Sequence, residues 1–191
     1  YAEVRQVMQK AYGQLRIGNP LDQQNHVGPL IDRHAVEIYL KALEQIKVQG
    51  GRMLVEGGVI EGAEYSSGCY VRPCIAEVQA DMKIVHEETF APILYLMTYQ
   101  TLEEAITIQN NVPQGLSSAI MTEGLREAEL FLSARGSDCG IANFGQLIVG
   151  QVKNIFPVEQ IASLCRSIQA TDQVHQSRFS RTRRSDNCQI F

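Results

Sequence analysis

Strand-like and helix-like segments alternate through the middle of the sequence, and this alternation constrains the fold more than any other feature. Residues 92–99, 117–122 and 139–143 are short apolar or β-branched runs, as expected for strands. Between them, residues 102–110 and 125–134 carry apolar side chains at the spacing of an amphipathic helix. Strands separated by helices favour a parallel sheet with helices on both faces, so we predict an α/β fold.

Helices and strands are also predicted in the N-terminal half. Apolar side chains fall on one helical face over residues 2–15 and again over residues 35–49. Strand-like segments follow at 52–58 and 69–78, between glycine-rich or charged turns. The first helix has no recognisable N-cap, so we expect the chain to begin within or directly at an element, as a fragment of a longer protein would.

A capping box is predicted at the start of the helix at 102–110. Thr101 is followed three residues later by Glu104. The hydroxyl would accept from one free backbone amide, and the carboxylate would reach back to another.

Composition excludes several classes of protein. The chain has 191 residues, 45% of them hydrophobic and 20% charged, which is typical of a globular protein. It has no apolar run long enough for a membrane span, and its first residues lack the pattern of a signal peptide, so we expect a cytoplasmic location without membrane partners. Its net charge of −4 gives no reason to expect a nucleic-acid partner. The five cysteines are odd in number and widely spaced, which argues against a disulfide scaffold.

The character of the sequence changes after Asn143. Residues 1–143 are acidic on balance, whereas residues 144–191 are basic, polar and without clear periodicity beyond one possible helix after Pro157. We expect residues 144–191 to be a poorly packed or disordered tail. Its basic cluster could bind phosphates, but a solvated tail is the simpler interpretation; the cluster consists of Arg178, Arg181, Arg183 and Arg184, with Phe179 among them.

The residues alone leave three interpretations of the pair Glu87–Glu88. It could be a general acid and base, a metal site with His86, or a solvated turn before a buried Phe90. Adjacent residues of an extended segment point to opposite sides, so the two carboxylates would not naturally share one substrate or one ion. The histidines lack the spacing of a metal site, and we predict no metal.

The cysteines and glycines do not by themselves define a catalytic or nucleotide site. Each cysteine is more simply interpreted as a packed or surface residue than as a nucleophile, because no base or orienting partner can be named; they are Cys69, Cys74, Cys139, Cys165 and Cys188. The glycine-rich loops that bind phosphates in dinucleotide-binding and P-loop proteins are absent.

Five ordered motifs resemble the C-terminal half of the catalytic region of NAD(P)-dependent aldehyde dehydrogenases. They are LRIGNPLDQQNHVGPLID, GCYVRPCI, HEETFAPILY, NNVPQGLSSAIMT and GSDCGIAN, and together they lie within residues 1–143. TFAPI, QGLSS and GSDCGI are similar to the antiquitin branch, whose members oxidise α-aminoadipic semialdehyde and related aldehydes to the acid. The resemblance implies that residues 1–143 are part of an aldehyde dehydrogenase catalytic domain and that residues 144–191 are a divergent tail.

The resemblance also implies a cofactor, NAD, and two residues that contact it. Glu88 would accept hydrogen bonds from the hydroxyls of the nicotinamide ribose, which suits the two oxygens of a carboxylate. Phe90 would pack near the nicotinamide and help to orient it. The family's nucleophilic cysteine belongs to a Gly-Gln-x-Cys segment that would precede Tyr1, so the resemblance implies no catalytic residue within this chain.

Two functional hypotheses follow from the resemblance. In the first, the chain is part of an NAD-dependent aldehyde dehydrogenase and is inactive by itself. In the second, it is a truncated, non-catalytic polypeptide that is inactive or associates with a full-length relative. The family forms homotetramers, but residues 144–191 lack the family's glycine-rich substrate loop and oligomerisation strand, which puts assembly in doubt.

Overall fold

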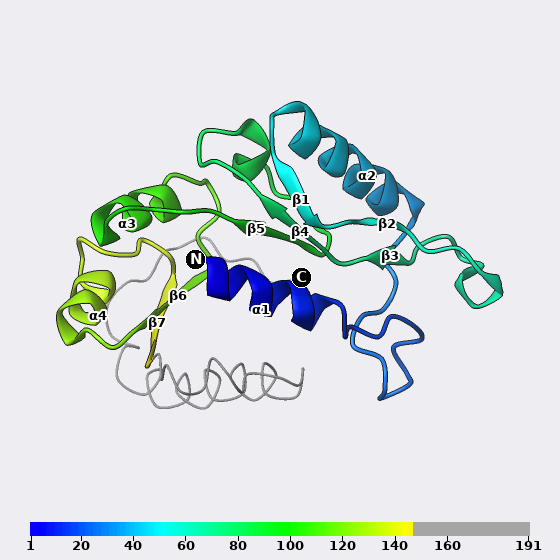
Figure 1. Ribbon diagram of the computed structural model, residues 1–191, viewed down its shortest axis with the longest axis horizontal. Coiled ribbons are helices and arrows are strands. Elements are labelled where there is room, and N and C mark those ends of the chain that lie inside the picture. The colour runs from blue at the N-terminus through cyan, green and yellow to red at the C-terminus, as the bar shows by residue number, and fades with distance from the viewer. Residues whose placement is uncertain (147–191) are drawn as a thin grey trace, which may run out of the picture. The chain divides into compact units, whose positions relative to one another are not determined.

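The computed structural model describes residues 1–146, in which helices and strands alternate as the sequence predicts (Figure 1). The helices are α1 (Ala2–Tyr12), α2 (Arg33–Val48), α3 (Leu102–Asn110) and α4 (Leu125–Leu132), with 3-10 turns η1 (Ala63–Tyr65) and η2 (Lys83–His86). The strands are β1 (Arg52–Val55), β2 (Gly58–Val59), β3 (Val71–Arg72), β4 (Cys74–Glu77), β5 (Ile93–Leu96), β6 (Ser117–Thr122) and β7 (Ile141–Gln146). The α/β class is confirmed. Residues 144–146, the first of the tail predicted for 144–191, belong to β7, and the rest of that tail lies outside the described residues.

The sheet that carries the core is mixed, whereas the sequence predicted a parallel one. Its strand order is β1-β4-β5, in which β4 pairs parallel with β5 and antiparallel with β1. The antiparallel pair arises because the chain enters β4 from the β2–β3 hairpin. It was not predicted because apolar alternation carries no information on strand direction. The β6–β7 pair is parallel, with α4 as its crossover, as predicted.

Helix α2 supplies five of the eleven buried residues of the core cluster, more than any other element. The side chain of Asp32 caps the N-terminus of the helix, because its Oδ1 accepts from the amide of Ala35 at 2.8 Å. The helix therefore begins earlier than its apolar spacing suggests. The apolar face packs on β4, and Tyr39 and Ile46 are fully buried there. The hydrogen-bonded cap and the buried face together explain why this long helix is stable.

The two faces of β4 contact different helices. Cys74 and Ala76 are fully buried in the cluster that contains the α2 side chains. On alternate positions, Glu77 accepts a hydrogen bond from the hydroxyl of Tyr1, the residue before α1. Figure 1 shows α1 and α2 on opposite sides of the β1-β4-β5 sheet. Helices therefore cover both faces, as predicted.

Tyr39 joins α2 to the β2–β3 hairpin by two hydrogen bonds. Its hydroxyl donates to the carbonyl oxygen of Arg72 at 2.6 Å and accepts from the amide of Gly58 at 3.0 Å. A Cβ on the neighbouring Gly57 would lie 2.2 Å from this hydroxyl oxygen, so only glycine fits there. Burial raises the pKa of Tyr39 far above its usual 10.0, which keeps the hydroxyl protonated.

The predicted capping box forms only in part. The hydroxyl of Thr101 accepts from the amide of Glu104 at 3.2 Å, as predicted. The Glu104 carboxylate instead accepts from the amide of Gln100 at 2.6 Å, one residue before the N-cap. None of the helices in the described part of the chain is long and apolar enough to cross a membrane.

Candidate functional site

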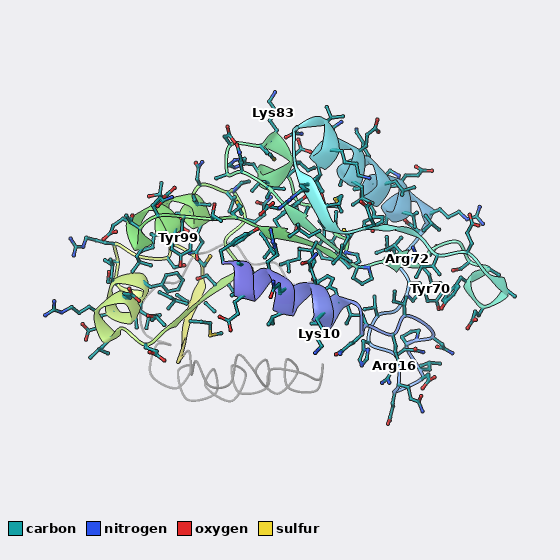
Figure 2. The ribbon with its side chains drawn as sticks, viewed as in Figure 1. Lys10, Arg16, Tyr70, Arg72, Lys83 and Tyr99 are labelled. Atoms are coloured by element: carbon teal, nitrogen blue, oxygen red, sulfur yellow. The ribbon has the colours of Figure 1, made fainter. Side chains whose placement is uncertain are left out.

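The segment that contains Glu87 and Glu88 leaves the core at η2. Ile84 is buried, and its amide donates to the Gln49 side-chain oxygen at 3.1 Å, so η2 is anchored to the end of α2. Lys83, labelled in Figure 2, is exposed on the same turn. Glu87 then has extended backbone angles, φ −98° and ψ 131°, and directs the chain away from the turn.

Two consecutive three-residue turns connect this segment to β5. The amide of Ala91 donates to the carbonyl oxygen of Thr89 at 2.7 Å, and the amide of Ile93 donates to that of Ala91 at 2.8 Å. Phe90 and Pro92 are therefore the central residues of the two turns, and the missing N–H of Pro92 costs no hydrogen bond. The carbonyl oxygen of Pro92 accepts from the amide of Cys74 at 3.0 Å, which joins the turns to β4.

Glu88 and Phe90 are both exposed on this segment. The Phe90 side chain is 86% exposed, so the alternative of a solvated turn before a buried phenylalanine is wrong for that residue. Glu87 and Glu88 are exposed as well, and no side-chain hydrogen bond or salt bridge of theirs is present within residues 1–146. An aromatic ring and a carboxylate thus lie two residues apart, unpaired, on the open surface. Their role in binding a cofactor stays a prediction.

The segment lies apart from two surface grooves of the described part of the chain. Two surface grooves of about 470 Å³ each flank α2. One lies between the start of α2 and residues 59–68, and the other between the end of α2 and residues 79–83. Residues 86–90 line neither groove, so a ligand held by Glu88 and Phe90 would need further walls.

His86 connects the segment to two other parts of the chain. Its Nδ1 lies 2.8 Å from the carbonyl oxygen of Asn111, and its Nε2 lies 2.9 Å from that of Ala80. Asn111 is the C-cap of α3, and Ala80 belongs to the loop after β4. From the sequence, His86 is a candidate only as a metal ligand, because carbonyl partners that are distant in sequence leave no local pattern.

The C-terminal end of α3 also holds the turn before β7. The Gln109 side chain donates to the hydroxyl of Ser137 at 2.7 Å, and the Asn110 side chain donates to the carbonyl oxygen of Gly136 at 2.8 Å. The amide of Asp138 donates back to the Asn110 side-chain oxygen at 3.2 Å. The motifs NNVPQGLSS and GSDCGIAN are therefore joined at one end of α3.

In the described part of the chain, the cysteines and histidines are not brought together into a catalytic or metal site. Cys74 is fully buried, and burial raises the pKa of its thiol from the usual 9.0 to about 11, so it is a poor nucleophile near neutral pH. Cys69 and Cys139 are half-buried at separate places. Within residues 1–146 no group of three or more histidine, cysteine or acidic side chains could hold a metal ion. Cys165, Cys188 and His175 lie outside the described residues.

Tyr95, on β5 after the turns, has a buried hydroxyl without a hydrogen-bond partner among residues 1–146. Burial raises its pKa above the usual 10.0, and the nearby Thr89 side chain opposes the rise. Buried hydroxyls are normally paired, so this one is a local weakness beside the exposed segment.

Comparisons with known proteins agree on one family. The sequence pattern described as "Aldehyde dehydrogenase family" matches residues 1–158. A curated relative from Pisum sativum, "Aldehyde dehydrogenase family 7 member A1", is 46% identical over 143 residues, which are 75% of this chain and 27% of the relative. "Alpha-aminoadipic semialdehyde dehydrogenase" of Mus musculus is 44% identical over 142 residues, covering 74% of this chain and 26% of the relative.

A solved structure gives the same result for the fold. It is assigned as a methylmalonate-semialdehyde dehydrogenase from Sinorhizobium meliloti 1021, complexed with NAD, and matches with a TM-score of 0.65 at 25% identity. The match covers 70% of this chain and 27% of that structure. The chain thus spans about a quarter of the length of the relatives that it matches.

Proposed function

The chain belongs to the aldehyde dehydrogenase family, and from that premise we propose that residues 1–143 form part of the catalytic domain of an NAD-dependent oxidoreductase that oxidises an aldehyde to a carboxylic acid. The relatives from pea and mouse support the antiquitin branch, and the printed name of the mouse relative supports α-aminoadipic semialdehyde as the substrate. The NAD complex of the 25% identical structure supports NAD as the cofactor. A cytoplasmic location and assembly into a tetramer stay predictions.

The observation that carries this proposal is the exposure of both Glu88 and Phe90, two residues apart, with Phe90 86% exposed. A large aromatic ring at the centre of a tight turn gains nothing from water and is available to pack on another ring. The unpaired carboxylate two residues away can accept two hydrogen bonds from neighbouring hydroxyls. These groups fit the ribose and nicotinamide end of NAD.

The residues of this segment bind and orient, whereas NAD supplies the hydride acceptor when bound. Glu88 holds the ribose hydroxyls, and Phe90 restricts the position of the nicotinamide ring. We also propose that the 191 residues alone do not oxidise aldehydes, because burial raises the pKa of the Cys74 thiol and no hydrogen bond within residues 1–146 joins a cysteine sulfur to a histidine. The nucleophile and the remaining walls of the site would come from segments outside these residues.

A segment exchange tests the proposal. The matched segment of the pea relative is replaced by residues 1–143 of this chain, and reduction of NAD is measured with α-aminoadipic semialdehyde. We expect activity in the exchanged protein and none in the purified 191-residue chain. Glu88→Gln in the exchanged protein should raise the KM for NAD about tenfold, the loss of roughly one charge-assisted hydrogen bond. An unchanged KM for NAD would contradict the role of Glu88.

A second candidate function is binding to a full-length relative without catalysis. It is favoured by large apolar side chains that are strongly exposed: Leu21, Ile31, Leu116 and Leu125 are 70% exposed or more. Size-exclusion chromatography of the 191-residue chain mixed with the intact pea relative distinguishes the two candidates. A stable mixed complex would support the second candidate, and separate elution would count against it.

A further inference from the structure

The exposed segment 87–90 has few contacts of its own that determine where Glu88 lies. The amide of Glu87 donates to the carbonyl oxygen of Ile84 at a long 3.4 Å, and the two bonds that close the turns, from Ala91 to Thr89 and from Ile93 to Ala91, are local. The far end is held by the bond between Cys74 and Pro92. The near end depends on the residue that precedes Glu87.

That residue is His86, whose ring is held on both sides. Its Nδ1 and Nε2 lie 2.8 Å and 2.9 Å from the carbonyl oxygens of Asn111 and Ala80. Carbonyl oxygens only accept hydrogen bonds, so each contact requires a proton on the ring nitrogen that faces it. A neutral imidazole satisfies one of the two contacts, and an imidazolium satisfies both.

The contact with Asn111 has a further physical basis. The last carbonyl groups of a helix have no partner within the helix, and they carry the negative end of the helix dipole. A ring N–H from His86 supplies a donor at this end of α3. The contact therefore fixes His86, and with it the start of the exposed segment, relative to α3.

We infer that His86 is a positioning residue for cofactor binding: it fixes Glu88 relative to the end of α3 through the hydrogen bond from Nδ1 to the carbonyl oxygen of Asn111. The inference rests on the proposed function of Glu88. Gln109 and Asn110, at the same end of α3, hold the turn at 136–138. The exposed segment 87–90 and that turn are therefore both attached to the C-terminal end of α3.

Three substitutions of His86 separate positioning from simple packing. In His86→Asn the side-chain amide nitrogen takes the place of Nδ1 and can still donate to Asn111. In His86→Gln it takes the place of Nε2 and can still donate to Ala80. His86→Leu keeps apolar bulk but makes neither hydrogen bond.

The first experiment uses the isotope-labelled 191-residue chain and does not need NAD. The imidazole nitrogen spectrum of the unsubstituted chain should show a hydrogen-bonded proton on Nδ1 of His86. The amide resonances of Glu88 and Phe90 should stay in place in His86→Asn and should move in His86→Gln and His86→Leu. Equal movement in the Asn and Leu variants, or none in the Leu variant, would overturn the inference. Similar thermal midpoints for the Asn and Gln variants show that the fold is retained.

The second experiment uses the exchanged pea relative described above. His86→Leu and His86→Gln should raise the KM for NAD about tenfold, His86→Asn should restore it, and the KM for the aldehyde should not change. In a Glu88→Gln background, His86→Leu should add no further increase, because it acts through Glu88. If Glu88→Gln has no effect, the proposed function fails; if Glu88→Gln has its effect but the His86 variants do not, only the role of His86 fails.

Discussion

The contact between α2 and β4 and the segment 87–90 lie close together in the fold, yet they differ in almost every physical respect. At the contact, Tyr39 and Ile46 are fully buried, and the tyrosine hydroxyl has two hydrogen bonds. On the segment, Phe90 is 86% exposed and the carboxylates have no partners within the described residues. The difference teaches that the contact between α2 and β4 stabilises the fold, whereas the segment exposes the groups proposed to bind the cofactor.

Truncating one apolar side chain in each region should give the largest difference. Ile46→Ala creates a cavity in the core and should lower the free energy of unfolding by about 2–5 kcal/mol. Phe90→Ala removes an exposed ring and should change it by less than about 0.5 kcal/mol. Urea unfolding followed by circular dichroism measures both values. Equal losses in the two variants would remove the distinction between the regions.

High pH should weaken the buried region first. The pKa of Cys74 is raised from 9.0 to about 11 by burial. Between these values the unfolded thiol loses its proton while the folded one keeps it, so stability is constant below about pH 9 and falls as the pH rises to about 11. The loss from Cys74 should be about 2–3 kcal/mol. The raised pKa of Tyr39 acts in the same direction above pH 10.

Unfolding measured from pH 7 to pH 11 tests this expectation. Cys74→Ala should flatten the decline, whereas Cys69→Ala, at a half-buried cysteine, is the matched control and should leave it in place. A decline that is as steep in Cys74→Ala as in the unsubstituted chain would show that the thiol is not its source.

Two tyrosines give the finest comparison, because the same atom is removed from each. Tyr39→Phe leaves the carbonyl of Arg72 and the amide of Gly58 without their partner and should cost about 1–3 kcal/mol. Tyr95→Phe removes a buried hydroxyl that has no partner, so stability should be unchanged or higher by about 1 kcal/mol. A large loss in Tyr95→Phe would show that its hydroxyl is paired in solution.

Much of the fold was predictable from the sequence, because apolar spacing reports which face of an element is buried. The four helices lie where that spacing places them, and the parallel β6-α4-β7 unit follows from alternation. The direction of β1 was not predictable, since an antiparallel and a parallel neighbour bury the same side chains. The early start of α2 at Asp32 was missed because the cap precedes the first apolar residue.

Less of the candidate site was predictable. Glu88 and Phe90 were predicted as cofactor contacts only through the resemblance, and residue type alone would have placed Phe90 in the core. The contacts of His86 join residues that are distant in sequence, and they depend on carbonyl groups that every residue has. No side-chain pattern can therefore reveal them before the fold is known.

The parallel pairing of β4 with β5 has a consequence for how this chain can tolerate changes of length. Parallel neighbours require a crossover, and here residues 78–92 form it. Cys74 pairs with Ile93 in register, so an inserted or deleted residue cannot be absorbed by sliding the strands without exposing buried side chains. The change in length of the crossover would instead displace Glu88 and Phe90. Random insertion libraries should tolerate extra residues in the exposed loop around Leu21 and reject them between β4 and β5.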